Sequence, residues 1–395
     1  MKNTIIYIGA MYLPDQNADA QRALSICKSF RDLGYNVVMI GIDLQQKSGT
    51  PILETKRDIF GFTAFTVSKP KKIKELIHYS TSIREIKEVI NFYQPENIFA
   101  VIALEHDAIA LMRLISFCKK KEVLFIADAE EWYEKSNLRF PLNIAKDLDT
   151  WLRMRYIYPK KVKNMICISR FFERHYEKNI AHRVVVPGTI DKNDEKWLKL
   201  VQYKPNEIFT LGYAGTPGLK MEKERLDWLL IALKELNEEG YNCGLKIAGV
   251  DEVTVNNILQ DDSTKYNIEA MGRIPHNDCL NLIASSDFSV IVREDKRVTR
   301  AGFPTKLSES FGCGTPVITT RTSNIADFII KGKTGFLCDN CSKESLKKTI
   351  IEAMKLSKES LVNIHSELKN SCLLQYQEYN QKIYEFLEDI KGESL

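Results

Sequence analysis

Residues 301–318, Ala-Gly-Phe-Pro-Thr-Lys-Leu-Ser-Glu-Ser-Phe-Gly-Cys-Gly-Thr-Pro-Val-Ile, contain the signals that decide the fold. Pro304 suits the first position of a helix, because it has no N–H to leave unpaired and its φ already matches the helix. Gly312-Cys-Gly314 then stops the helix, and a buried strand is predicted from Pro316. We expect this loop, helix and strand to hold a ligand.

The helix predicted from Pro304 has the features of an anion site. The free N–H groups of Thr305 and Lys306 would point out of its N-terminus, where the helix dipole favours a phosphate, and Lys306 adds a full positive charge. Glu309, about one turn further along, could accept hydrogen bonds from a vicinal diol such as a ribose. The alternative is a surface helix on which Lys306 and Glu309 are simply solvated.

This stretch resembles the retaining glycosyltransferases of family 4. The matching positions are Gly302, Phe303, Glu309, Gly314, Thr315, Pro316 and Val317. The resemblance implies an α/β, GT-B fold of two Rossmann-like domains facing across a cleft, a nucleotide-diphosphate sugar as donor, and no required metal or other cofactor. Ala301 stands where the family usually has a glutamate that contacts the transferred sugar, which leaves the donor sugar open. The Ala-Gly-Phe-Pro-Thr-Lys form resembles branches that act in surface-polysaccharide assembly.

Length and composition fit a soluble protein of two domains. The chain has 395 residues, of which 44% are hydrophobic and 27% charged. A net charge of +4 is too small to indicate nucleic-acid binding. No apolar run is long enough for a signal peptide or for the roughly 18 residues of a membrane span. We therefore expect a cytoplasmic protein, in solution or at the inner face of the membrane.

Alternating strands and helices predict two parallel sheets. The first series has strands near 5–9, 37–42, 60–67, 98–104, 123–127, 165–168 and 184–186, and the second has strands near 209–214, 245–248, 268–271, 288–292, 317–319 and 336–337. Pro187-Gly188 and the polar stretch after it place the boundary between about 190 and 206. This gives an N-terminal domain, 1–195, for the acceptor and a C-terminal domain, 206–372, for the donor. In the resembled family a helical tail, here 373–395, returns to the first domain.

The donor site is expected to include the glycine-rich turn after the strand 209–214. Gly215 and Thr216 in this turn would expose N–H groups, and a nearby cation can neutralise a departing diphosphate. The family places a basic residue after this turn, and Lys223 fits that place best, with Lys220 as the competitor. An exposed lysine at a helix start is the alternative.

Further donor contacts follow from other strand ends. Arg273 follows the strand 268–271, where the family contacts the nucleotide base, whereas His276 is expected to cap or pack the next helix. Gly9, at the end of the first strand, leaves room for a ligand close to the backbone. His106 stands where the family often has a histidine beside the donor sugar, although Glu105 could hold that place, and a histidine satisfied by local hydrogen bonds is the alternative.

The acceptor is expected to contact the sequence after the strand 123–127. Asp128, Glu130, Glu131 and Trp132 combine carboxylates with an aromatic ring, and related polysaccharide enzymes show a similar pattern. Such carboxylates could bind acceptor hydroxyls or act as a base, and a structural turn is the alternative. We predict no metal site here.

Two basic stretches are candidates for membrane contact. Residues 69–74 are Lys-Pro-Lys-Lys-Ile-Lys, and residues 139–163 interleave cations with aromatic residues. This combination fits an anionic membrane face or a lipid-pyrophosphate acceptor, and a solvated face is the alternative.

The function predicted from the sequence is glycosyl transfer. A hexosyl- or hexosaminyl-type enzyme of the resembled family would move a sugar from a nucleotide diphosphate, UDP-sugar being favoured, to a saccharide or lipid-linked saccharide. Lys223, Lys306 and His106 are the expected catalytic residues. A sugar-nucleotide epimerase of the same fold is the alternative enzyme. A non-catalytic nucleotide-binding partner is a third possibility, indicated by Ala301 in place of the family's glutamate.

Overall fold

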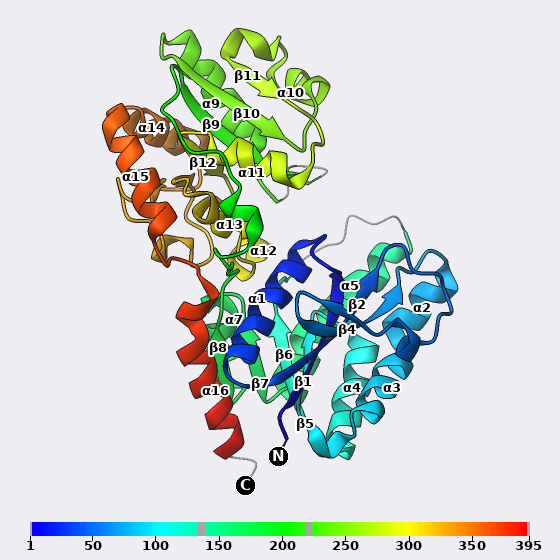
Figure 1. Ribbon diagram of the computed structural model, residues 1–395. Helices are drawn as coiled ribbons and strands as arrows, with labels where there is room; N and C mark the ends of the chain where they lie inside the picture. Colours follow the sequence, from blue (N-terminus) through cyan, green and yellow to red (C-terminus); the bar gives the residue numbers. More distant parts are fainter. Residues whose placement is uncertain (1, 133–139, 219–220, 222, 393–395) are drawn as a thin grey trace. The chain divides into compact units, whose positions relative to one another are not determined.

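The computed structural model describes residues 2–132, 140–218, 221 and 223–392. The chain divides into two compact units, each described here by itself (Figure 1). Unit 1 is Met1–Thr189 together with Tyr376–Leu395, and unit 2 is Ile190–Gln375. The change of unit thus falls at Ile190, at the start of the polar stretch singled out from the sequence, and again at Tyr376. Both units are α/β, as the sequence predicted.

Unit 1 is built on an eight-stranded sheet in the order β3-β4-β2-β1-β5-β6-β7-β8. The strands are β1 (Thr4–Tyr12), β2 (Asn36–Asp43), β3 (Arg57–Ile59), β4 (Phe62–Ser68), β5 (Ile98–Leu104), β6 (Leu124–Ala129), β7 (Asn164–Cys167) and β8 (His182–Val185). All neighbours pair in parallel except β3 and β4, which form an antiparallel edge. Buried strands of this kind are apolar along their whole length, which explains why β5 shows no polar alternation.

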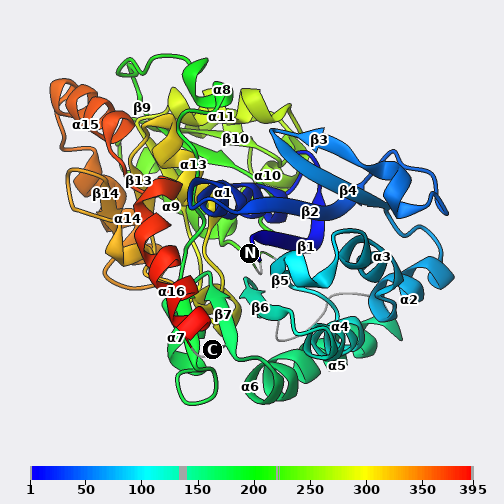
Figure 2. The same cartoon turned by 60° about the horizontal axis from the view of Figure 1, so that its bottom comes forward.

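Helices cover both faces of this sheet. They are α1 (Ala18–Asp32), α2 (Ile73–Thr81), α3 (Arg84–Phe92), α4 (Ala108–Lys120), α5 (Leu142–Leu152), α6 (Tyr158–Lys161), α7 (Arg170–His175) and α16 (Asn380–Gly392). Apolar residues of α1 and α16 share one core with β1, β2 and β5, whereas α3 and α4 lie on the other face (Figure 2). The C-terminal helix α16 therefore belongs to unit 1.

Unit 2 has a six-stranded, fully parallel sheet in the order β11-β10-β9-β12-β13-β14. Its strands are β9 (Phe209–Ala214), β10 (Cys243–Ala248), β11 (Ile268–Ala270), β12 (Phe288–Ile291), β13 (Val317–Thr319) and β14 (Gly335–Leu337). Its helices are α8 (Glu195–Leu198), α9 (Leu226–Glu238), α10 (Glu252–Leu259), α11 (His276–Ala284), α12 (Arg297–Ala301), α13 (Thr305–Cys313), α14 (Lys343–Ala353) and α15 (Lys358–Asn370). The apolar faces of α9, α10 and α14 form one core with the sheet, and α11 contributes to a second.

Each sheet has a point at which the chain order reverses. In unit 1 it lies at β1, which has β2 on one side and β5 on the other, and in unit 2 it lies at β9, between β10 and β12. Open α/β sheets bind ligands beyond the carboxyl ends of the strands at such points. The loops after β1, β5, β9 and β12 are therefore the places to look for sites.

Two local expectations from the sequence differ from the structure. The strand expected near 60–67 begins later, because Phe60 and Gly61 have φ values of 52° and 80° and form the turn between β3 and β4. The Asp58 carboxylate accepts a 3.1 Å hydrogen bond from the Gly61 N–H and stabilises that turn. Pro304 is the residue before α13 rather than its first residue. Among the described residues, no helix has both the length and the apolar character that crossing a membrane requires.

Candidate functional site

The turn after β9 runs very close to α13. Gly215 has a φ of +135°, and its N–H donates a 2.9 Å hydrogen bond to the carbonyl of Ala248. A Cβ added to Gly215 would lie 2.6 Å from Cε of Lys306, and one added to Gly249 would lie 2.5 Å from the Gly215 carbonyl oxygen. Both positions require glycine, because any side chain would push the turn away from its neighbours.

Lys306 lies in the first turn of α13, and its amine is held from two sides. Nζ forms an ion pair with the Glu224 carboxylate and lies 4.0 Å from the centroid of the Tyr213 ring. The side chain of Lys306 is 19% exposed and that of Glu224 8% exposed, so water screens the pair only in part. Burial, and then the nearby Glu224 carboxylate, raise the pKa of the Tyr213 hydroxyl well above its ordinary value.

Glu309 follows Lys306 on α13 and contacts the first residue of α11. Nε2 of His276 lies 3.2 Å from Oε1 of Glu309. From the sequence, His276 was expected to cap or pack the helix that it begins. The contact with Glu309 was not predicted, because it joins two helices, α11 and α13, that only the fold brings together. The Glu309 side chain is still 23% exposed, so it can accept a hydrogen bond from a ligand.

These groups converge on one pocket of unit 2. The pocket has a volume of about 140 Å³, and Gly215, His276, Lys306 and Glu309 are among the residues that line it. It lies beside the end of β9, where the strand order of the sheet reverses. A cation and a carboxylate beside a tight glycine turn suit a ligand that carries both an anionic group and hydroxyls.

Unit 1 has a larger pocket, of about 450 Å³, near its own reversal point. Gly9, Tyr79 and His106 line it. His106 is 6% exposed, its ring meets the edge of the Tyr79 ring at 5.7 Å between centroids, and burial lowers its pKa, so the imidazole is neutral at pH 7. Among the residues that the structure describes, none forms a hydrogen bond with Nε2 of His106. That nitrogen is also shielded from solvent, so a ligand would reach it only if the surrounding side chains moved.

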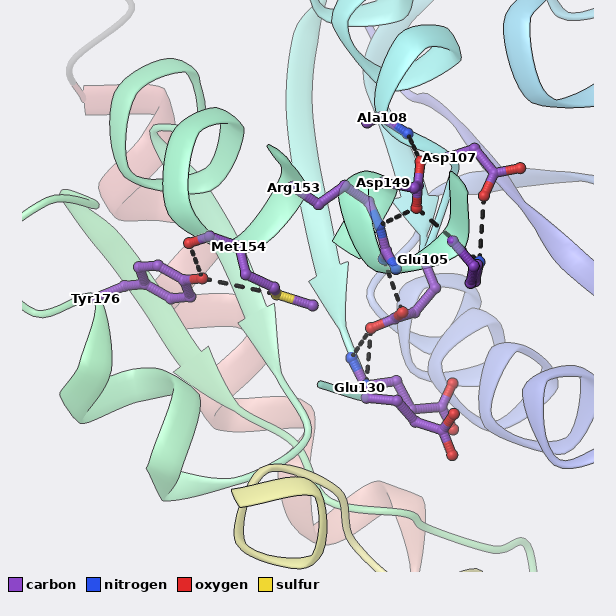
Figure 3. A network of polar contacts seen from close by, with 10 residues as sticks. Glu105, Asp107, Ala108, Glu130, Asp149, Arg153, Met154 and Tyr176 are labelled. Atoms are coloured by element: carbon purple, nitrogen blue, oxygen red, sulfur yellow. Dashed lines mark hydrogen bonds and ion pairs between the residues drawn. The ribbon is translucent and has the colours of Figure 1, made fainter. Parts of the chain in front are cut away.

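Glu105, the alternative to His106 in the sequence reading, is engaged within the protein. Its Oε1 accepts hydrogen bonds of 2.9 and 2.7 Å from the N–H groups of Glu130 and Glu131, and its Oε2 accepts one of 2.8 Å from Arg153 (Figure 3). Glu105 thus ties the loop after β5 to the loop after β6. Its role is to position the residues beside the pocket.

Asp128 and Trp132, expected at the acceptor, lie in the interior of unit 1. Asp128 is fully buried; its carboxylate pairs with the Arg22 guanidinium at 2.6 Å and accepts a 2.5 Å hydrogen bond from the Tyr7 hydroxyl. Trp132 is 4% exposed and stacks near the ring of Tyr176. A ligand could reach Asp128 only by displacing these partners, and the acceptor role expected of both residues stays a prediction.

Glu130 and Glu131 continue the loop beyond Asp128. Glu130 is 6% exposed, and burial, followed by the nearby Asp19 carboxylate, raises its pKa well above the ordinary value. Both effects favour the protonated form of the Glu130 carboxyl. Glu131 is half-buried, and its N–H is bound by Glu105. The acceptor role of these two residues stays a prediction.

Several expected donor residues lie outside the residues that line the unit 2 pocket. Thr216, Lys223 and Arg273 are exposed. Lys220, the alternative to Lys223, lies outside the described residues. Glu224, next to Lys223, is the buried neighbour whose carboxylate meets Lys306, and nothing in the sequence around it distinguishes it from a surface glutamate.

The residues before α13 shape its start. Gly302 ends α12, Pro304 precedes α13, and Thr305 is the first helical residue. Phe303 is 6% exposed and meets the Phe328 ring edge-on at 5.7 Å between centroids, so it anchors this loop in the protein.

Comparison with known proteins agrees with this geometry. Residues 220–369 match the family model described as "Glycosyl transferases group 1". This segment, which is less than half of the chain, is similar to that family. The segment includes Glu224, His276, Lys306 and Glu309, whereas Gly215 precedes it. No curated protein matches the chain in sequence.

Solved glycosyltransferase structures share the fold of the whole chain. A glycosyltransferase from Rickettsia africae has a TM-score of 0.66 at 14% identity and covers 98% of each chain. The catalytic domain of starch synthase IV from Arabidopsis thaliana, bound to ADP and acarbose, has a TM-score of 0.68 at 9% identity over 98% of this chain and 99% of that one. The Anabaena protein HepE, in complex with UDP and glucose, has a TM-score of 0.61 at 12% identity over 98% and 100%. The chain therefore has the GT-B fold of these glycosyltransferase structures.

Proposed function

We propose that the protein is a retaining glycosyltransferase that moves a sugar from a nucleotide diphosphate to a saccharide or lipid-linked saccharide. The observation that carries the proposal is the convergence of Lys306, Glu309 and Gly215 on one pocket at the strand reversal of unit 2. The nucleotides in the similar structures, ADP and UDP, support a nucleotide donor. A UDP-sugar and a role in surface-polysaccharide or glycoconjugate synthesis follow from the family resemblance of residues 301–318.

The reaction breaks the bond between the anomeric carbon and the diphosphate oxygen. The diphosphate leaves with the electron pair, the acceptor hydroxyl oxygen bonds to the anomeric carbon, and the departing phosphate takes the hydroxyl proton. Negative charge grows on the leaving group, so a fixed cation beside it lowers the barrier. Lys306 would supply this charge, and the proposed reaction needs no metal.

Glu224 does not exclude this role for Lys306. A lysine ammonium has three N–H donors, and the contact with Glu224 occupies one. The others can meet phosphate oxygens, together with the free N–H groups at the start of α13. Glu309 would accept hydrogen bonds from the ribose hydroxyls, and His276 would hold its carboxylate in place.

The acceptor is assigned to unit 1. His106 lines a pocket of about 450 Å³ and has an unpartnered Nε2, and the buried carboxyl of Glu130 has a raised pKa. A neutral imidazole can donate or accept a hydrogen bond with a sugar hydroxyl.

A first test measures nucleotide binding and sugar transfer in Lys306→Ala and Glu309→Gln, with Lys355→Ala as the control, because Lys355 is exposed on the same unit and away from the pocket. Each pocket variant should bind UDP about 10- to 100-fold more weakly, since a hydrogen bond to a charged group contributes about 1.5–3 kcal/mol. Calorimetric titration reports the affinity and product chromatography the transfer.

The outcomes separate the competing functions. If each of UDP, GDP and ADP binds to the pocket variants with the same affinity as to the control variant, the assignment of the site is wrong. If the sugar of the donor changes without any acceptor, the protein is an epimerase. If the nucleotide binds in the pocket but no acceptor receives a sugar, the protein is a non-catalytic partner.

A further inference from the structure

One face of unit 1 exposes far more apolar surface than the rest of the chain. Half of the exposed large hydrophobic side chains among the described residues lie on α2, α4 and the segment 140–156. The most exposed are Phe140 at 78%, Ile73 at 74%, Ile77 and Ile144 at 57%, and Trp151 at 56%. Exposed apolar groups gathered in this way indicate an interaction surface, whereas scattered ones would not.

The helices that carry these residues are neighbours. α4 contacts α2 on one side and α5 on the other. None of the residues of α2, all of which the structure describes, is buried. On α5, Ile144, Leu148 and Trp151 follow the spacing i, i+4, i+7 and so form a single outward ridge. We call α2, α4 and residues 140–163 the apolar-basic face.

Cations surround these apolar groups. Residues 69–74, which lead into α2, have four lysines and no carboxylate, and residues 140–163 have six cations and two carboxylates. Lys160 and Lys161 are exposed beyond the α5 ridge, as is Arg155. The face is therefore positive as well as apolar.

The carboxylates near these cations are engaged in internal contacts. Glu75 of α2 accepts hydrogen bonds of 2.8 and 3.2 Å from the N–H groups of Lys71 and Lys72. Asp149 of α5 pairs with the buried Arg153 at 3.1 Å. Lys146 of α5 pairs with Asp107 at 3.3 Å, whereas Lys160 and Lys161 are exposed and can meet an outside anion. Asp147 is the other carboxylate of α5.

We propose that the apolar-basic face docks on the surface of an anionic lipid bilayer. Exposed aliphatic and tryptophan side chains can enter the boundary between head groups and acyl chains, while lysines attract anionic lipids. A protein partner of ordinary composition would match the apolar part of this face but not its excess of positive charge. This inference does not depend on sugar transfer, although docking would bring the unit 1 pocket near a lipid-linked acceptor, because α4 begins at the carboxyl edge of the sheet just after His106.

The test is flotation of the whole protein, without nucleotide, with vesicles of phosphatidylglycerol and phosphatidylcholine in equal parts, and with vesicles of phosphatidylcholine alone. Binding should be much stronger to the anionic vesicles and should fall as salt rises. The double substitution Lys160→Glu with Lys161→Glu should weaken binding about 30-fold, the equivalent of about 2 kcal/mol for two lysines near an anionic surface. Trp151→Ser should also weaken it.

Matched controls lie on unit 2. Lys355→Glu with Lys358→Glu changes the net charge by the same amount, and Val253→Ser removes a side chain that is 70% exposed on α10. Both controls should bind vesicles as the unaltered protein does, and all variants should keep their affinity for UDP.

Three results would overturn the proposal. The first is equal or absent binding to both kinds of vesicle. The second is equal weakening by the control pair and the Lys160/Lys161 pair. The third is a self-association that sedimentation detects in the unaltered protein and that Trp151→Ser abolishes, because the face would then be a contact between copies of the chain.

Discussion

At the scale of single residues, Glu224 decides how Lys306 can act. Its buried carboxylate holds the amine beside the glycine turn, but it also offsets the positive charge that a diphosphate would meet. Two unit charges about 6 Å apart at an effective dielectric constant of about 20 interact by roughly 3 kcal/mol. The repulsion between Glu224 and a bound diphosphate is thus larger than the roughly 1 kcal/mol by which a hydrogen bond to a carboxylate exceeds one to a neutral amide.

We therefore predict that Glu224→Gln binds UDP more tightly, by up to about tenfold, whereas Glu309→Gln binds it more weakly. If the two substitutions change the UDP affinity in opposite directions, the effect comes from charge, because general damage to the site would weaken binding in both variants. Isothermal titration at constant ionic strength gives both affinities. Weaker binding by Glu224→Gln would show that orientation of Lys306 outweighs its charge.

His365 provides a second prediction at this scale. It is 4% exposed, its Nε2 donates a 3.1 Å hydrogen bond to the Asp287 carbonyl, and its ring stacks on Tyr203 with 3.5 Å between centroids. Burial lowers its pKa from 6.5 to about 4. The unfolded chain therefore binds a proton between pH 6.5 and 4 that the folded chain does not, and stability falls as the pH falls through this range.

The expected loss of unfolding free energy is on the order of 3 kcal/mol between pH 6.5 and pH 4. His365→Phe keeps a ring against Tyr203 but cannot take up a proton, so its stability should depend less steeply on pH in that range. Urea unfolding at several pH values measures both proteins. Parallel pH profiles would mean that the pKa of His365 is the same in the folded and the unfolded chain.

At the scale of elements, the glycine turn after β9 allows the cost of backbone strain to be distinguished from the cost of a steric contact. Gly215→Ala would place a Cβ 2.6 Å from Cε of Lys306 at a φ of +135°. Gly240 also has a positive φ, of +90°, but nothing lies within 4 Å of the Cβ that it would gain. Both substitutions should lower the free energy of unfolding by about 1–2 kcal/mol, and Gly215→Ala alone should also weaken UDP binding.

Thermal unfolding and nucleotide titration of the two alanine variants test this pairing. Equal UDP affinities in both variants would show that the turn can move without disturbing Lys306. The close contact between Gly215 and Lys306 would then not be required for nucleotide binding.

The elements differ in how far the sequence could predict them. The limits of β5 and β9 were predicted as observed, because buried parallel strands are continuous apolar runs. The edge strand β3 was missed, since Arg57 and Asp58 carry no apolar signal and pair only through the turn at Gly61. Local patterns predict local structure, and β3 owes its conformation to its partner β4.

The same limit applies to the candidate site. Lys306 and Glu309 were predicted because one helix start places both, and they line the pocket. Their partners Glu224 and His276 were missed, since each lies more than 30 residues away and only the fold brings it there. The ion pair of Asp128 was not predicted, because a carboxylate after a strand gives the same signal whether it faces a ligand or Arg22.

At the scale of the whole molecule, the chain leaves unit 1 and returns to it. Residues 376–395 belong to unit 1, where Ile383, Phe386, Leu387 and Ile390 of α16 join the core formed by α1 and the sheet. Unit 2 is by contrast continuous in sequence. A substitution that weakens the packing of α16 should therefore lower the stability of unit 1, although α16 is the last helix of the chain.

We predict that Phe386→Ala lowers the stability of unit 1 and leaves nucleotide binding by unit 2 intact. Phe386 is 4% exposed, and removing a buried phenylalanine costs about 3–5 kcal/mol, whereas Tyr384→Ala, at a position that is 47% exposed on the same helix, should cost far less. In calorimetry, UDP at 100 times its dissociation constant should stabilise unit 2 by about 2.7 kcal/mol and so identify its transition. Phe386→Ala should shift the other transition. A shift confined to the UDP-sensitive transition would mean that α16 stabilises unit 2 and that the division of the chain at Tyr376 does not describe how it unfolds.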